Sequence, residues 1–125
     1  MIHLDTSMLV DALTGPRRSA QRLRRAFEHG ERIQLDTLVL YEWLRGPRTA
    51  AELRDQEALF PRDAAVGFGA AEAARAAKLY GLVKRPRGRE IDLAIAACAL
   101  AHGAALLTLN PADFSDIPEL ILADF

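Results

Sequence analysis

The region after residue 89 restricts the possible folds most. It first runs EIDLAIAACALAH over residues 90–102, a helix-length segment that is apolar on almost every side and is expected to be buried against a sheet. Gly103 ends this helix, and residues 104–110, AALLTLN, then form an apolar strand without alternation. Strands of this kind occur in parallel sheets that helices cover on both faces. The region therefore predicts an α/β fold.

The rest of the chain alternates short apolar strands with helical segments. This order favours parallel pairing with helices as crossovers, and it predicts one domain over residues 1–125 with three α/β/α layers and a central parallel sheet of about five strands. Two of the strand segments, 64–68 and 119–125, also fit loops. The expected strands are 1–4, 33–37, 64–68, 104–110 and 119–125, and the expected helices are 8–13, 17–29, 38–46, 49–59, 70–82 and 90–102.

Composition excludes several classes of protein. Half of the 125 residues are hydrophobic and 26% are charged, which is typical of a folded globular chain. No apolar run approaches the ~18 residues of a membrane span, and the first residues lack a basic, apolar signal segment. The single cysteine, Cys98, is expected to be a small core residue in a reducing cytoplasm.

Basic residues cluster in two places, although the net charge is only −1. The cluster at residues 17–25 fits either phosphate contacts or a solvated helix face. In the second cluster, Pro86 and Gly88 interrupt the basic run, so Arg85, Arg87 and Arg89 are expected in a loop. Arginine suits bidentate phosphate contacts, which makes this loop a candidate for binding a phosphate backbone.

Four acidic residues fall near the expected carboxyl ends of strands. Asp5 ends the first strand, Glu42 lies one turn into the helix after the second, Asp92 is in the first turn of the buried helix, and Asp113 follows Asn110 after the fourth strand. Each has an ordinary explanation as well. Asp5 fits a helix cap, Asp92 the positive end of its helix, Asp113 a turn, and Glu42 a solvated position.

Taken together, the four acids predict a metal site, because the carboxyl ends of parallel strands share one edge of the sheet. Carboxylates about 5 Å apart repel by roughly 3 kcal/mol per pair at an effective dielectric near 20. Protons or cations must neutralise such a cluster. Hard oxygen ligands favour Mg²⁺ or Mn²⁺, which prefer phosphate as a further ligand. The pattern therefore points toward phosphodiester chemistry.

Four motifs in order resemble one known family over nearly the whole chain. The sequence resembles the PIN-domain ribonucleases and, more narrowly, the VapC-type toxins of toxin–antitoxin pairs. Each motif is weak alone, but four at these spacings are fairly specific. They read LDTS at 4–7, YEWLRG at 41–46, EIDLAIAACAL at 90–100 and LLTLNPADFSDIPEL at 106–120.

The resemblance implies an α/β/α PIN fold and a metal-dependent endoribonuclease. Asp5, Glu42 and Asp92 match the first three acids of the family. Both Asn110 and Asp113 match the fourth motif; we favour Asp113 as the metal ligand, with Asn110 positioning it or a water. The residues that match the small polar positions beside the acids, and are expected to orient the carboxylates, are Thr6, Ser7 and Thr108.

The resemblance also implies cofactors and partners. One or two Mg²⁺ or Mn²⁺ ions would activate water at the phosphorus, and Glu42 would bind through water or help deprotonate the nucleophile. Arg85, Arg87 and Arg89 could hold the RNA backbone, although Arg89 could instead tune Asp92 or form a salt bridge. A homodimer and a small antitoxin covering the acids are expected. Residues 70–82 and Leu38, Val39, Tyr41 and Trp43 could form the apolar surface for them, although such residues are more often core.

Two other classes of function remain open from the sequence. The first is a non-catalytic PIN-like module that binds nucleic acid or protein, although all four acidic positions are filled here. The second is a metal-dependent DNA nuclease or phosphatase with a similar acidic cluster, since nothing in the sequence excludes DNA as the substrate.

Overall fold

Three short parallel strands form the centre of the molecule. The computed structural model describes residues 1–125. Strands β1 (Ile2–Leu4), β2 (Ile33–Gln34) and β3 (Ala105–Leu107) pair in the order β2-β1-β3, with Ile2 opposite both Ile33 and Ala105. The helices are α1 (Thr6–Leu13), α2 (Ala20–Glu28), α3 (Thr37–Arg45), α4 (Ala50–Leu59), α5 (Ala70–Leu82) and α6 (Glu90–Ala101).

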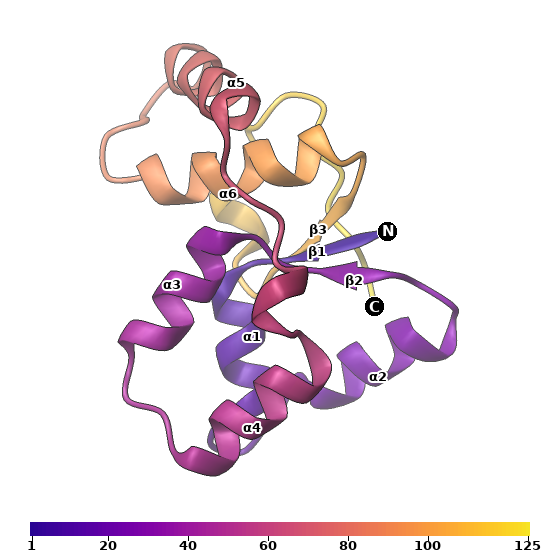
Figure 1. Ribbon diagram of the computed structural model, residues 1–125. Coiled ribbons are helices and arrows are strands. Elements are labelled where there is room, and N and C mark those ends of the chain that lie inside the picture. The colour runs from indigo at the N-terminus through magenta and orange to yellow at the C-terminus, as the bar shows by residue number, and fades with distance from the viewer.

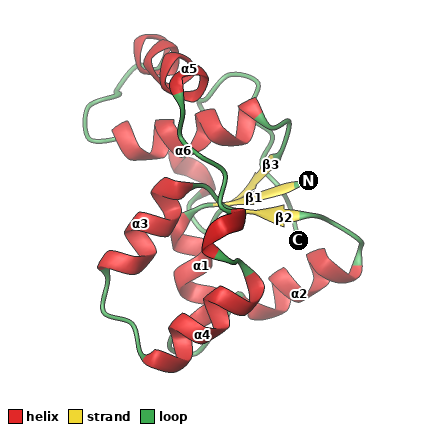
Figure 2. Ribbon diagram, viewed as in Figure 1, coloured by secondary structure: helices red, strands yellow, loops and turns green.

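Helices cover both faces of this sheet (Figure 1; Figure 2 shows the same view by secondary structure). Helices α5 and α6 pack together on one face, and α1, α2 and α4 lie on the other. The carboxyl ends of the strands point left in Figure 1, toward α3 and the first turn of α6. Helix α3 contacts both α1 and α6 there. None of the helices is both long and apolar enough to cross a membrane.

The prediction of a parallel α/β fold is confirmed, but the prediction of about five strands is wrong. Residues 64–68 and 119–125 reach the two edges of the sheet and pair there only as isolated bridges, Asp36 with Val66 and Leu106 with Leu122. A 3-10 turn over Arg62–Ala64 and the glycine after Val66 shorten the first of these segments. Edge segments of this length supply too few backbone hydrogen bonds to form strands.

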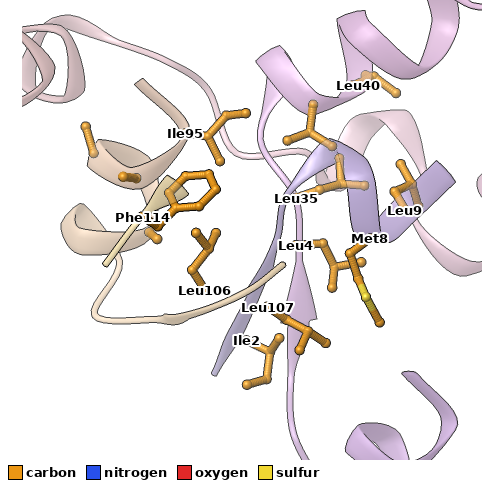
Figure 3. Close-up of a cluster of buried hydrophobic side chains, with 14 of the residues drawn as sticks. Ile2, Leu4, Met8, Leu9, Leu35, Leu40, Ile95, Leu106, Leu107 and Phe114 are labelled. Carbon is orange, nitrogen blue, oxygen red and sulfur yellow. The ribbon is translucent and has the colours of Figure 1, made fainter. Parts of the chain in front are cut away.

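The core is one cluster of 23 buried hydrophobic residues that spans both faces of the sheet. Leu4 lies with Met8 and Leu9 on one face, whereas Leu106 lies with Ile95 and Phe114 on the other (Figure 3). Helix α6 is buried along most of its length, as its all-round apolar sequence predicted. Because strand side chains alternate, His3 points away from the face that Ile2 and Leu4 occupy.

The first two strands end in the same way. In each, a Leu-Asp-Thr tripeptide leaves the strand and starts a helix, at residues 4–6 and 35–37. Asp5 accepts a 2.9 Å hydrogen bond from the backbone N–H of Met8 and caps α1; Asp36 caps α3 in the same extended conformation. Helix α1 therefore begins at Thr6, before the residue 8 expected from the sequence.

Candidate active site at the carboxyl end of the sheet

Asp5 is buried at the end of β1, where three side chains or backbone groups hold its carboxylate. Oδ1 accepts hydrogen bonds from the backbone N–H of Met8 and, at 2.8 Å, from Ser7 Oγ, while Oδ2 accepts one from Thr108 Oγ1. Burial raises the pKa of Asp5; these hydrogen bonds oppose the rise and the charge of Glu42 adds to it. Asp5 is thus both a helix cap and an oriented carboxylate next to a second acid.

Glu42 of α3 lies beside Thr6, the residue that follows Asp5. Thr6 Oγ1 donates a 2.5 Å hydrogen bond to Glu42 Oε1, which joins the start of α1 to the middle of α3. Arg45, one turn along, lies 3.5 Å from Glu42 Oε2. Only 20% of the Glu42 side chain is exposed, so the solvated position considered from the sequence does not apply.

Asp92 in the first turn of α6 is half-buried, and the charges of the other acids influence its pKa. Burial is the largest cause that raises its pKa, followed by the negative charges of Asp5, Asp113 and Glu42; Arg89 acts in the opposite direction. Four acids from four separate segments therefore face one region. Repulsion from the other acids adds to burial in making ionisation of Asp92 less favourable, and a nearby cation would relieve that repulsion.

Asp113 and Asn110 lie in the loop after β3, and the structure distinguishes them. Asp113 ends the 3-10 turn Pro111–Asp113, and its exposed carboxylate is one of the charges that raise the pKa of Asp92. The side chain of Asn110 caps no helix, and its backbone links it to the site: its N–H donates to Thr108 Oγ1 at 3.0 Å and its carbonyl accepts from the N–H of Asp113 at 3.0 Å. Of the two residues, the charge of Asp113 reaches the acidic region.

The four carboxylates face one region without converging on one point. No group of three or more Asp, Glu, His or Cys side chains lies close enough together to hold a metal ion. The influences on the pKa of Asp92 act over longer distances than metal coordination, so the two observations are compatible. Convergence on a single ion stays a prediction.

The basic loop lies next to the acids, but its three arginines differ. Arg89 binds Asp116 through both guanidinium NH₂ nitrogens, at 2.9 and 2.7 Å, and donates to the carbonyl of Asp113 at 2.8 Å. This contact with Asp116 raises the pKa of Arg89. The salt-bridge alternative considered from the sequence therefore describes Arg89. Arg85 and Arg87 are exposed, and Arg85 lines an open cleft of about 590 Å³ that also includes Asp113.

Sequence reasoning missed a buried polar pair behind the site. His3 Nε2 and Asp36 Oδ2 are 2.7 Å apart, and neither side chain is exposed. Hydrophobic patterning gives no signal for such a pair, because both residues lie within or next to short apolar strands. The repeated Leu-Asp-Thr tripeptide was the available signal for Asp36 alone, since it places Asp36 at the same kind of junction as Asp5.

Comparisons with known proteins agree with this architecture. The family model described as the PIN domain matches residues 2–120. The fold is similar to that of VapBC2 from Rickettsia felis bound to a promoter DNA fragment, with 24% identity, a TM-score of 0.78 and coverage of 100% of this chain and 99% of that chain.

Two further solved structures share the fold. DNA-bound VapBC from Salmonella typhimurium is 20% identical, with a TM-score of 0.78 and coverage of 98% of this chain and 96% of that one. FitAcB from Neisseria gonorrhoeae is 19% identical, with a TM-score of 0.74 and coverage of 98% and 97%. A comparison with the sequences of curated proteins finds no match.

Proposed function

Because the chain belongs to the PIN-domain family, we propose that it is a divalent-metal-dependent endoribonuclease and the toxin of a VapBC-type toxin–antitoxin pair. The observation that carries the proposal is that the charges of Asp5, Glu42 and Asp113 all reach Asp92 and help to raise its pKa. A fold that only bound a partner would gain nothing from this repulsion.

The donor set fits Mg²⁺ or Mn²⁺. All four acids offer hard oxygen ligands, and the raised pKa values of Asp5 and Asp92 reflect burial and negative charge that a cation would relieve. Asp5, Asp92 and Asp113 would hold the ion, with Glu42 at its side. When bound, such an ion supplies a water of lowered pKa and offsets charge on the scissile phosphate.

The protein's own groups would prepare the site for this ion. Thr108, Ser7 and the Met8 N–H fix both oxygens of Asp5, so this carboxylate loses little freedom on binding. Thr6 fixes Oε1 of Glu42 and leaves Oε2 toward solvent and Arg45. We assign Glu42 Oε2 to accept the proton of the attacking water, or to bind the ion through a water.

RNA is the substrate that we propose, held by the basic loop. Arg85 lines the cleft that contains Asp113, and Arg87 is exposed two residues further along the same loop; their guanidinium groups could bind successive phosphates. Arg89 would support that loop through Asp116 rather than contact RNA. Phosphate contacts alone do not separate RNA from DNA, so single-stranded DNA is the matched alternative substrate.

Apolar surface supports the proposed antitoxin and a homodimer. Tyr41 and Leu82 are 59% and 58% exposed, and an open groove of about 450 Å³ between α3, α5 and α6 includes Leu38, Tyr80 and Ile91. Of the α3 residues considered from the sequence, Val39 and Trp43 are core residues instead. A second apolar groove, of about 500 Å³, lies between α1, α2 and α4.

Cleavage assays test the proposal directly. Purified protein is incubated with RNA and with single-stranded DNA of the same sequence, in Mn²⁺, in Mg²⁺ and in EDTA. We expect metal-dependent cleavage of RNA that Asp5→Asn and Asp92→Asn abolish, while Asp63→Asn, an exposed acid outside the site, retains it. Cleavage that Asp92→Asn leaves unchanged would contradict the mechanism, and cleavage of DNA alone would contradict the substrate.

A further inference from the structure

The carboxylate of Asp36 connects elements that carry the candidate site. One oxygen, Oδ1, accepts hydrogen bonds from the backbone N–H groups of Leu38 and Val39, at 2.8 and 2.9 Å, and so caps α3. The other, Oδ2, lies 2.7 Å from Nε2 of His3 in β1. Both oxygens are thus used, and the residue is completely buried.

Partners on both sides fix the His3 ring. The side-chain nitrogen of Gln34 lies 2.9 Å from Nδ1, so the amide donates there and the ring proton is on Nε2, where it donates to Asp36. Each polar atom of the pair therefore has a partner inside the protein. A network that is satisfied in this way holds its members in one arrangement.

The charge of the same carboxylate also acts on Cys98 of α6. The Cys98 thiol is completely buried, and its pKa is raised to about 12, mainly by burial and also by the charge of Asp36. Asp36 thus bonds His3 of β1, acts through its charge on Cys98 of α6, and caps α3. These three elements carry Asp5, Asp92 and Glu42 respectively, and Asp5 directly follows β1.

We propose that Asp36, with His3 as its partner, is a positioning residue that holds β1 and α3 together so that Asp5 and Glu42 meet at one edge. The inference rests on the proposed function, because it concerns how that site is assembled. Asp36 itself is sealed from solvent and touches neither substrate nor metal.

Stability alone does not account for the pair. A serine would cap α3 as well as an aspartate does, and a buried carboxylate gives little net stability compared with apolar residues of similar volume, because its desolvation offsets its hydrogen bonds. The carboxylate differs from these alternatives because its two oxygens bond α3 and β1 at the same time and at fixed distances. These bonds determine the relative position of the two elements rather than the free energy of unfolding.

A double substitution separates the two roles. His3→Leu with Asp36→Ser keeps the cap, fills the space beside β1 and removes the connection between the elements. Leu23→Ala, a core substitution in α2, serves as a control that lowers stability away from the pair. Thermal melting measures stability, calorimetric titration measures Mn²⁺ affinity, and steady-state cleavage of RNA gives kcat and KM.

We expect the double variant to melt near the wild type, to bind Mn²⁺ about tenfold or more weakly, and to lose kcat by a similar factor with little change in KM. Leu23→Ala should lower the melting temperature and keep the Mn²⁺ affinity. Asp36→Ser alone removes the buried charge, retains the cap and gives the same test if the double variant does not fold.

Two outcomes overturn the inference, and they are distinguishable. Wild-type Mn²⁺ affinity and kcat in the folded double variant, or in Asp36→Ser, would overturn the positioning role and leave the proposed function intact. Failure of the wild-type protein to bind Mn²⁺ would overturn the proposed function, and the positioning role with it.

Discussion

Thr6 Oγ1 donates a 2.5 Å hydrogen bond to Glu42 Oε1. Thr6 directly follows the candidate ligand Asp5, and it orients a second candidate ligand, Glu42. The bond joins two helices that start at different strands of the sheet. The second oxygen of Glu42, Oε2, has only the 3.5 Å contact with Arg45. Orientation of a carboxylate by a hydroxyl has a measurable consequence for metal binding.

Thr6→Val should weaken Mn²⁺ binding about tenfold, since valine keeps the shape of threonine and removes the donor. The loss of stability should be small, about 1 kcal/mol, as expected for one partly exposed hydrogen bond. Calorimetric titration with Mn²⁺ measures the first effect and urea unfolding the second. Thr14→Val, which removes a hydroxyl bond to the carbonyl of Val10 at the end of α1, is the matched control. Equal Mn²⁺ affinity in both variants would contradict the role of Thr6.

Asp92→Asn should stabilise the metal-free protein, by roughly 1 kcal/mol, because it removes a half-buried charge that three other acids repel. The same substitution should abolish the stabilisation that Mn²⁺ gives the wild type. Melting in EDTA and in Mn²⁺ measures both effects. The exposed Asp63→Asn should change neither. A metal-free Asp92→Asn protein that melts below the wild type would argue that Asp92 is a structural residue.

The metal-free protein should lose stability as the pH rises through the raised pKa values of Asp5 and Asp92. The pKa of each is above its unfolded value of 3.8. Between the unfolded and folded pKa values the native state binds more protons, so the free energy of unfolding falls as these carboxyls ionise.

Urea unfolding in EDTA at a series of pH values above 4 measures this slope. Asp92→Asn should flatten it, whereas Asp116, whose pKa is lowered by Arg89 from 3.8, affects stability mainly below this pH range. Saturating Mn²⁺ should reverse the slope, because ions bind the deprotonated carboxylates. A rise in stability with pH in EDTA would show that repulsion among the acids is not dominant.

Arg85→Gln and Arg87→Gln should each raise the KM for RNA and reduce its dependence on salt, with little change in kcat, because each removes one phosphate contact. Steady-state cleavage at several salt concentrations measures this. Arg54→Gln, on the exposed side of α4, removes the same charge away from the cleft and is the control. An equal effect of all three substitutions would indicate only a general attraction between the protein and RNA.

The sequence predicted the parts of the fold that depend on long apolar segments. Helix α6 and strand β3 follow from residues 90–110, because a segment that is apolar all round has no stable place except the interior. The prediction of two outer strands was wrong because residues 64–68 and 119–125 have the composition of strands but pair with the sheet only through Val66 and Leu122. Composition does not reveal how many backbone hydrogen bonds an edge segment makes.

The candidate site was predictable to a similar extent. Topology placed Asp5 and Glu42 at one edge, and the structure joins them through Thr6. The ion pair of Arg89 with Asp116 was only one of several alternatives, since both residues belong to loops whose approach the sequence does not fix. The contact of His3 with Asp36 crosses 33 residues between two strands, and no local pattern encodes it.

The repeated Leu-Asp-Thr junction gives this molecule an internal reference. Two aspartates with the same flanking residues and nearly the same backbone angles differ only in what surrounds them. Asp5 is affected by the negative charge of Glu42, whereas Asp36 is completely buried beside a histidine. Carboxylate signals from the two can therefore be compared within a single NMR sample, where any divergence on adding a cation reports environment rather than residue type or helix geometry.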